Sequence, residues 1–441
     1  MVVGAGLSGL CAARRLRAQG ASVVVVEARD RVGGRMLTHT IGEGAFDLGG
    51  QWIGPDQKRV HALVDELGMS TSPTYTKGKK VLEVAGKVST YTRSISSMSL
   101  PNLIQLTGAL SYLNRIRKRV SPSSPMIAEG ASDLDSETLE TWRSRIVKSS
   151  KINGVIDAAV RTIFGAEPRD LSALYFLMHT NAGGGLLNLT EARGGAQQAS
   201  IVGGTQQICA RIADGLGESL VLNTPVRRLV QSRDGVDAVS DQCTLGGRYA
   251  IVATPPTLAG RIEYEPAVSV GRDQLTQRFA MGAVVKVVVT YEHAFWREAG
   301  FSGEAVSSEG PFSVVYDSTS HDGRQPALLG FIVGNQARQW STQPLADRQR
   351  RVTGALARYF GDAANSFSDY RELDWGLEIW SRGGPMASLP PGVLTSSFAH
   401  LRKPEGRIHW AGTETATEWI GYMEGAIQAG ERAADEILRR L

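Results

Sequence analysis

The sequence predicts an α/β fold with two interleaved domains, and three parts of the chain carry that prediction. Residues 2–35 run from a short apolar strand through Gly4-x-Gly6-x-x-Gly9 into a helix-forming segment, and then into a second apolar run that ends at Glu27. Residues 407–438 again give a strand, a glycine-rich turn and a helix. Between these ends, the strand-rich stretch 263–385 predicts a second sheet.

The first glycine motif has the spacing of a Rossmann-type dinucleotide site. Gly4 permits the tight turn, Gly6 lets the backbone approach a pyrophosphate, and Gly9 lets the helix pack on the strand. The helix N-terminus carries a positive partial charge that favours phosphate. Glu27 follows where a carboxylate accepts from ribose hydroxyls, so NADP fits worst. The predicted contacts here are Gly4, Gly6, Leu7, Ser8, Gly9 and Glu27.

The residues after Glu27 favour FAD as the dinucleotide. The run Arg29-Asp-Arg-Val-Gly-Gly34-Arg35 resembles the second phosphate-binding element of FAD proteins of the glutathione-reductase type. Its glycines allow backbone contact, and its arginines can reach phosphates. The following Gly-Gly-Gln-Trp run suits a backbone that passes over an isoalloxazine ring, with a plain loop as the alternative. The predicted contacts are Ala28, Arg29, Gly34, Arg35, Gly49, Gly50, Gln51 and Trp52.

The C-terminal block predicts the other side of the same site. A strand at 408–411 leads into Gly412-Thr413, and an amphipathic helix begins after Gly421. Reduced flavin carries negative charge near N1 and the C2 carbonyl, and a helix N-terminus there stabilises it by about 0.3–1 kcal/mol. The predicted contacts are Gly412, Thr413, Gly421, Tyr422, Met423 and Ala426.

At this point the chain resembles the flavin-dependent monoamine oxidases. The block GTETATEWIGYMEGAIQAGERAA at 412–434 is close to a family signature, and SALYFL, VGGTQQ, GAVVKVVVTY and PPGVLT are intermediate landmarks. The resemblance extends to soluble bacterial amine oxidases such as cyclohexylamine oxidase. The resemblance implies a Rossmann-type, glutathione-reductase-like FAD domain (1–71, 197–262 and 386–441). It also implies an α+β substrate domain (72–196 and 263–385) with a mixed sheet flanked by helices.

The resemblance assigns the reaction to few residues. Lys286 lies in a run of valines, where a lysine must extend its charge to solvent, form an ion pair or take part in the reaction. The resemblance implies that it holds a water at flavin N5 and assists the reaction with O2. Trp375 is expected against the flavin, with an ordinary core tryptophan as the alternative. Tyr422 is expected on the substrate side of the ring, and Val226 near the adenine.

The pocket departs from the mitochondrial members in two places. Gly384 occupies the position where those enzymes join a cysteine to the flavin, so FAD is expected to bind non-covalently. Pro385 replaces the second wall of an aromatic cage, which leaves Tyr422 alone. The other matched positions are neutral and mostly apolar, and simple core packing is the alternative for each. They are Thr162, Ile163, Leu189, Ala196 and Phe331.

The expected function is oxidative deamination of primary alicyclic, arylalkyl or alkyl amines with O2. The products are an imine and H2O2, and hydrolysis of the imine gives an aldehyde or ketone plus ammonia. Polyamine and L-amino-acid oxidases share the FAD motifs, but they need acids along the tunnel or an arginine for the substrate carboxylate. An FAD-bearing binding protein without turnover is a further alternative. The sequence leaves the mechanism open between hydride, radical and nucleophilic routes.

Composition fits this expectation. The 441 residues include 42% hydrophobic residues and a formal charge of +4, with small scattered basic groups, so no nucleic-acid partner is expected. Cys11, Cys209 and Cys243 lack metal-ligand spacing and fit reduced thiols in a cytoplasm. No long uncharged apolar window, signal peptide or C-terminal anchor is found, so no membrane contact is expected. Only three residues precede Gly4, so the sequence is expected to start inside a longer chain; a homodimer is left open.

Overall fold

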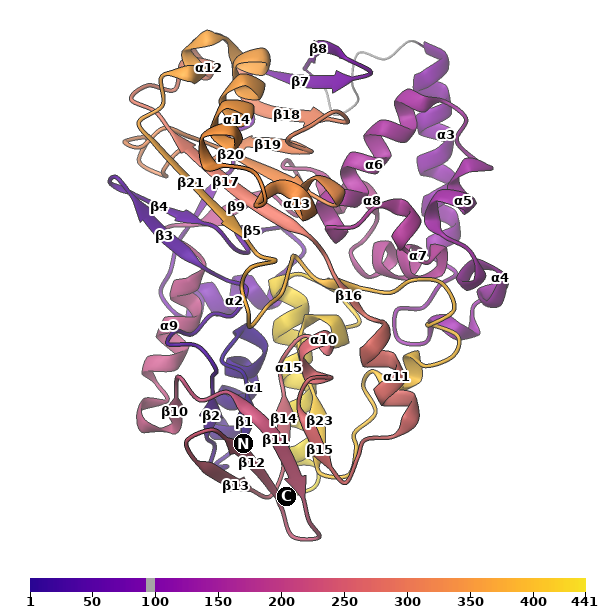
Figure 1. The fold of residues 1–441 in the computed structure, drawn as a ribbon, viewed down its shortest axis with the longest axis vertical. Coiled ribbons are helices and arrows are strands. Elements are labelled where there is room, and N and C mark those ends of the chain that lie inside the picture. The colour runs from indigo at the N-terminus through magenta and orange to yellow at the C-terminus, as the bar shows by residue number, and fades with distance from the viewer. Residues whose placement is uncertain (93–99) are drawn as a thin grey trace.

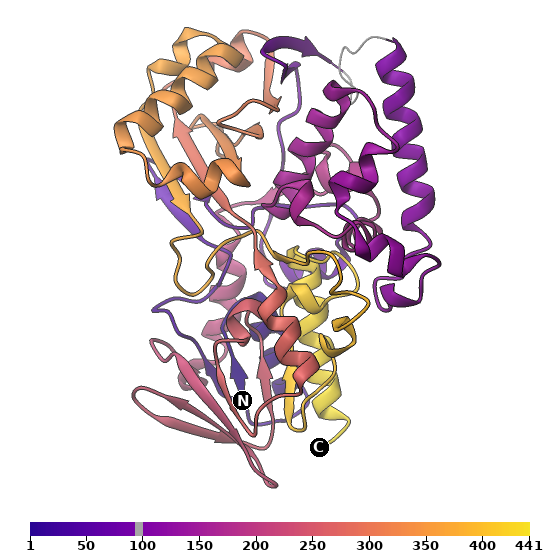
Figure 2. The same cartoon turned by 45° about the vertical axis from the view of Figure 1, so that its right-hand side comes forward.

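The structure is a computed structural model that describes residues 1–92 and 100–441. Two sheets dominate it, and both chain termini lie at the end far from the larger sheet (Figure 1 and Figure 2). Within the described ranges, none of the helices combines the length and apolar character that a membrane crossing needs. The arrangement is the predicted α/β fold with a second, mixed sheet.

A five-stranded parallel sheet in the order β10-β2-β1-β14-β23 forms the core of the first part. Its strands are β1 (Val2–Val3), β2 (Val25–Val26), β10 (Leu220–Val221), β14 (Ala250–Val252) and β23 (Ile408–Trp410). One face packs against helices, and the other packs against a four-stranded sheet. The helices are α1 (Leu7–Ala18), α2 (Lys58–Glu66), α9 (Gln206–Asp214) and α15 (Met423–Leu438). The covering sheet has β11 (Val226–Gln231), β12 (Val236–Ser240), β13 (Thr244–Gly247) and β15 (Glu263–Glu265).

Two of these strands are shorter than the apolar runs suggest. The run 23–26 forms a strand only over β2, and the run 408–411 only over β23. The neighbouring β1 is two residues long and pairs only Val2 with Val25 and Val3 with Val26. A ladder cannot extend beyond the shorter partner, so the partner rather than the apolar pattern limits β2.

The second part contains a seven-stranded sheet in the order β21-β17-β20-β19-β18-β7-β8. Its strands are β7 (Lys79–Val84), β8 (Lys87–Tyr91), β17 (Val284–Thr290), β18 (Phe301–Ser307), β19 (Val314–Asp317), β20 (Ala327–Val333) and β21 (Asp369–Asp374). All seven residues of β17 are buried, as the valine run predicts. Val285, Val287 and Val289 pack toward α14 (Leu345–Phe360). By the two-residue period, Lys286 faces the other side.

Further helices lie around this sheet. Figure 1 and Figure 2 both show a group of helices from residues 100–190 side by side, next to the sheet. They are α3 (Leu100–Arg117), α4 (Ala131–Ser136), α5 (Leu139–Ser144), α6 (Ser150–Phe164), α7 (Ala173–Ala182) and α8 (Leu186–Thr190). The stretch 137–150 is not one continuous helix, because α5 ends at Ser144 and α6 starts at Ser150. Ser149 there bonds to Gln105 and Asn102 of α3, so its backbone leaves the helix before α6 starts.

Short elements complete the fold. Small sheets join β3 (Thr38–Ile41) to β4 (Gly44–Asp47), β16 (Ala280–Met281) to β22 (Ala387–Ser388), and β9 (Ala199–Ile201) to both β5 (Trp52–Ile53) and β6 (Thr71–Pro73). The remaining helices are α10 (Pro256–Ala259), α11 (Val270–Arg278), α12 (Phe295–Glu298) and α13 (Asn335–Trp340). Turns of 3₁₀ helix lie at Pro125–Ile127, Pro168–Asp170, Gly217–Ser219, Asp362–Asn365, Phe398–His400 and Thr413–Thr415.

Candidate active site

A cavity of about 600 Å³ lies where the two large sheets meet. The chain enters its wall just after β1, β2, β14 and β23, which is the carboxyl edge where parallel sheets bind ligands. The wall contains most of the predicted cofactor residues, namely Gly4, Gly6, Leu7, Ser8, Glu27, Ala28, Arg29, Gly34, Arg35, Gly49, Gly50, Gln51, Trp52, Val226, Trp375, Gly412, Thr413, Gly421, Tyr422, Met423 and Ala426. It also contains Lys286 and the predicted pocket residues Thr162, Ile163, Ala196, Phe331 and Pro385.

The glycines bring backbone, and no side chain, to one stretch of the wall. A Cβ added to Gly34 would lie 3.3 Å from the Cα of Gly6, so the two predicted phosphate-binding elements touch each other. Gly4 has a φ of +105°, which favours glycine. Gly9 lies off the wall, but a Cβ there would lie 2.0 Å from the Gly4 carbonyl oxygen. Gly9 therefore allows α1 to pack on the strand, as its place in the motif predicts.

Polar groups on the wall also fit a dinucleotide. The Glu27 carboxylate is buried and is fixed by backbone N–H donors, from Ala5 at 2.7 Å and from Arg29 at 3.0 Å. A carboxylate accepts about four hydrogen bonds, so acceptor capacity remains for ribose hydroxyls. The hydroxyl of Thr254, also on the wall, is buried and has no partner among the described residues. A bound cofactor can supply the missing partner, so the residues present fit FAD.

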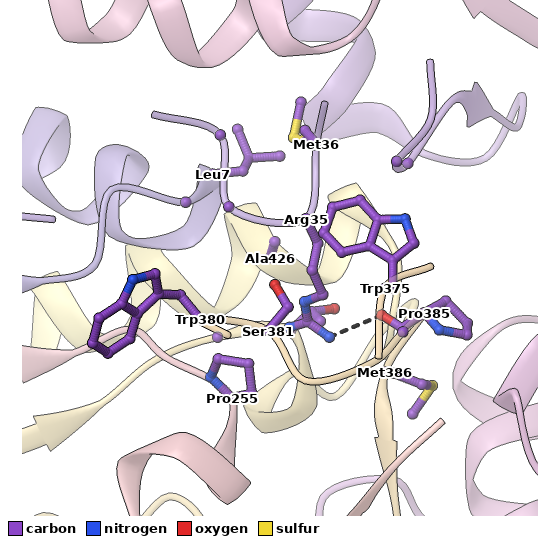
Figure 3. Close-up of a pocket in the computed structure, with 18 of the residues that line it drawn as sticks. Leu7, Arg35, Met36, Pro255, Trp375, Trp380, Ser381, Pro385, Met386 and Ala426 are labelled. Carbon is purple, nitrogen blue, oxygen red and sulfur yellow. Dashed lines mark hydrogen bonds between the residues drawn. The ribbon is translucent and has the colours of Figure 1, made fainter. Parts of the chain in front are cut away.

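The two arginines predicted to reach phosphates have protein partners. Arg35 makes a bidentate ion pair with Glu414 at 2.7 and 2.9 Å, and it donates to the Pro385 carbonyl at 2.8 Å (Figure 3). Burial opposes ionisation of Glu414, but Arg35 outweighs this effect and lowers the pKa of that carboxyl. Arg29 pairs with Glu378 at 3.2 Å. Contact of either arginine with phosphate stays a prediction, and the structure adds a role in joining distant segments.

Lys286 is fully enclosed by the protein. Its Nζ donates to the Gly49 carbonyl at 2.9 Å and to Oε1 of Gln51 at 2.7 Å, and it lies 5.2 Å from the centre of the Trp52 ring. Burial lowers the pKa of the ammonium to about 7, and the charge of Asp47 opposes that shift. The side chain is 1% exposed, so the snorkelling alternative is wrong. An ammonium has three N–H donors, so one remains for a group in the cavity.

The register of the large sheet sets the neighbours of Lys286. Phe331 of β20 pairs with Lys286 on one side and with Val314 of β19 on the other. Tyr316, two residues after Val314, therefore shares their face and lines the cavity, where its ring meets Trp52 edge-on at 5.0 Å. No motif in the sequence marks Tyr316, because only the strand pairing brings it to this face.

Trp375 and Tyr422 also reach the cavity wall. Trp375 is buried, its indole N–H donates to the Leu48 carbonyl at 2.8 Å, and Figure 3 shows its ring on the wall. Tyr422 directly precedes α15. Its ring lies edge-on against Trp419 at 5.2 Å, and its hydroxyl donates to the Leu189 carbonyl at 3.3 Å. Protein contacts therefore hold both aromatic side chains in place on the wall.

Leu189 is the one predicted pocket residue whose side chain does not line the cavity. It is fully buried and packs against Gly183, while its backbone carbonyl accepts from Tyr422 and from Nε2 of Gln197. Gln197 lines the cavity instead, and its Oε1 is buried without a partner among the described residues. Gln197 directly follows Ala196, which was predicted as a pocket residue. The position of this polar side chain next to Ala196 is the sequence feature that could have identified it.

Comparisons with known proteins agree with this geometry. Residues 7–438 match the family described as flavin containing amine oxidoreductase. The chain is 40% identical over 444 residues to the probable flavin-containing monoamine oxidase A of Dictyostelium discoideum, covering 100% of this chain and 97% of that one. It is 35% identical to the cyclohexylamine oxidase structure from Brevibacterium oxydans IH-35A, with a TM-score of 0.96 and coverage of 100% and 98%. It is 32% identical, with the same TM-score and coverage, to wild-type putrescine oxidase bound to putrescine.

These likenesses extend over the whole cavity wall and both ends of the chain. The family match includes the helix α1 that follows the glycine turn, the buried lysine of β17 and the helix α15 at the other end. The chain therefore belongs to the flavin-containing amine oxidoreductase family and is an FAD-dependent amine oxidase.

Proposed function

We propose that this enzyme oxidises primary monoamines whose amino group sits on an alicyclic, arylalkyl or alkyl carbon. In the overall reaction one amine loses two electrons and two protons to become an imine, and one O2 takes them up to become H2O2. Water then converts the imine into a carbonyl compound and ammonia. The observation that carries the proposal is the charge of the wall. Among the described residues, Glu27 is the only carboxylate on it, and Glu27 belongs to the predicted ribose end.

FAD held by these residues would supply the two-electron acceptor for the amine and the donor for O2. The protein side favours the neutral amine, because Tyr422, Phe331 and Tyr316 give an ammonium no carboxylate partner. Substrate is therefore expected to lose its extra proton on entry. Lys286 keeps one N–H directed to no protein acceptor among the described residues, and we assign that donor to the reaction with O2. Gly384 and the absence of Cys11, Cys209 and Cys243 from the wall support non-covalent FAD.

The neighbouring charges argue against a diamine as the best substrate. The acids whose charges act on Tyr316 are Glu304 and Glu191, and neither lines the cavity. Glu304 is already paired with Lys80 at 2.8 Å. Burial raises the pKa of the Glu191 carboxyl, which weakens it as a partner for a second ammonium. A diamine would leave its distal charge without a free carboxylate.

A substrate carboxylate is also poorly served. Arg35 donates to the Pro385 carbonyl. Its two terminal nitrogens, Nη1 and Nη2, also bond the two carboxylate oxygens of Glu414. An amino acid would have to break that buried pair in order to bind there.

We also propose that 1–71, 197–262 and 386–441 hold FAD and that 72–196 and 263–385 bind the amine. The parallel sheet draws its strands from the first set and the large sheet draws its strands from the second.

A peroxide assay with FAD-loaded protein tests the proposal. We expect kcat/KM for cyclohexylamine, benzylamine and hexylamine to exceed that for putrescine and leucine. Pro385→Tyr restores a bulky wall and should reduce activity with cyclohexylamine more than with hexylamine. A best substrate of putrescine or leucine, or an unchanged ranking in Pro385→Tyr, would overturn the assignment. Absence of anaerobic flavin bleaching with every amine would instead indicate a binding protein.

A further inference from the structure

The loop between β21 and β22 forms part of the cavity wall, with Trp375 at its start and Pro385 near its end. Its residues 376–382, here called the 376–382 segment, contain no helix or strand. Ile379, Trp380, Ser381 and Arg382 line the cavity. Leu377 points outward and is 71% exposed. The segment thus has four residues on the cavity wall and one apolar side chain that is exposed to solvent.

Ionic contacts fasten this segment to the second glycine element. The Glu378 carboxylate lies 3.2 Å from Arg29 and 3.5 Å from Arg31. The same Arg29 donates to the Ser381 hydroxyl at 2.8 Å. Arg29 and Arg31 come from the run that follows Glu27, so a surface loop is held by the element predicted to bind the ADP part of the cofactor. The Glu378 side chain is about one-third exposed, so salt can screen these pairs.

The position of Trp380 identifies which half of the cofactor the segment covers. Its ring centre lies 5.5 Å from the guanidinium of Arg227, the residue after Val226. Figure 3 shows Trp380 and Pro255 on one side of the view and Trp375 on the other. Glu27 and Val226 mark the adenosine end, whereas Trp375 belongs with the flavin ring. The flat indole is therefore placed to cover the adenine rather than the isoalloxazine.

We propose that the 376–382 segment is an adenosine clamp, in which Trp380 covers the adenine and the Glu378 pairs with Arg29 and Arg31 keep the cover closed. A base face stacks favourably on an aromatic ring, and an indole offers a large one. The clamp retains FAD in a protein whose wall offers no cysteine for a covalent link. It acts on cofactor retention and leaves the chemistry at the flavin ring untouched.

Release of FAD from the holoenzyme tests the clamp directly. The rate is followed by the fluorescence of free flavin after dilution, for wild type, Trp380→Ala, Trp380→Phe, Glu378→Gln and Leu377→Ala. We expect Trp380→Ala to release FAD about 5- to 150-fold faster, the range that loss of one base–aromatic contact of about 1–3 kcal/mol implies. Trp380→Phe keeps a ring and should stay within about threefold of wild type. Leu377→Ala, in the same segment but off the wall, should match wild type.

The contribution of the Glu378 ion pairs is measured separately, by the salt dependence of FAD release. Added NaCl should accelerate FAD release from wild type, because it screens the Glu378 pairs, and Glu378→Gln should release FAD faster and respond less to salt. Melting of the apoproteins separates clamp loss from misfolding, since all variants should melt together without FAD. Equal release from Trp380→Phe and Trp380→Ala, or an unchanged rate and salt response in Glu378→Gln, would overturn the clamp. Faster release accompanied by an equally destabilised apoprotein would assign the segment a structural role only.

Discussion

Replacing Lys286 by methionine should slow reoxidation of the reduced enzyme by O2 and leave its reduction by amine nearly unchanged. The ammonium is 1% exposed and uses two of its donors on Gly49 and Gln51, at 2.9 and 2.7 Å. The third donor is the one left for the cavity. Methionine has a similar length, so the strand of valines stays filled while charge and donors disappear. FAD should still bind, because no predicted FAD contact depends on that side chain alone.

The size of the effect follows from the lost donor. A hydrogen bond to a charged group contributes about 1.5–3 kcal/mol, which corresponds to a roughly 10- to 150-fold slower reoxidation. Because burial lowers the pKa of Lys286 to about 7, its ammonium loses the proton over an interval around neutral pH. Wild-type reoxidation should therefore slow as pH rises through this interval. Lys286→Met should lose that pH dependence.

Stopped-flow absorbance of the flavin separates the two half-reactions. Enzyme is first reduced by benzylamine without oxygen, and the reduced enzyme is then mixed with oxygenated buffer. Lys80→Met is the matched control, since Lys80 lies on β7 of the same sheet and pairs with Glu304 off the cavity wall. It should reoxidise like wild type. Unchanged reoxidation in Lys286→Met, or equal slowing of both half-reactions, would refute the role of this lysine.

Two further predictions concern the cofactor link and the buried ion pair. Acid precipitation should release all FAD into the supernatant, because Gly384 stands at the covalent position; flavin in the pellet would contradict this. Glu414→Gln should lower the free energy of unfolding by about 3–5 kcal/mol, since it leaves Arg35 unpaired. The folded pKa of Glu414 is lowered, so its contribution is present above the ordinary pKa of 4.5 and disappears as pH falls through the folded value. Urea unfolding at several pH values should show this loss in wild type and not in Glu414→Gln.

Local chemistry made the FAD elements predictable. The tight turn and the close backbone approach that require Gly4, Gly6 and Gly34 involve only a few neighbouring residues. Their spacing in the sequence was therefore enough to predict that they line the cavity. Lys286 was predictable because a charge inside a valine run contradicts its surroundings. These signals need no knowledge of the tertiary structure.

The other cavity residues could not be predicted, because their positions depend on contacts between distant parts of the chain. Tyr316 reaches the cavity only through the register of β19 with β20, and Leu189 turned its backbone rather than its side chain to the site. Trp380 and Glu378 lie in an irregular loop whose place depends on Arg29, almost 350 residues earlier in the chain. No periodicity in the sequence encodes such contacts. Competition between neighbours likewise shortened β2, where the apolar run alone predicted a longer strand.

The hydrogen bond from the Gly412 N–H to the Ser8 hydroxyl, at 3.0 Å, joins residues that are 404 positions apart. It connects the first turn of α1 to the turn after β23, and α15 then packs along α1. During synthesis, the ribosome adds Gly412 only 404 residues after Ser8. Closing such a distant contact is slow compared with forming local structure. Cofactor loading is therefore expected to follow translation, and nascent chains that stop before β23 should emerge as flavin-free, aggregation-prone species.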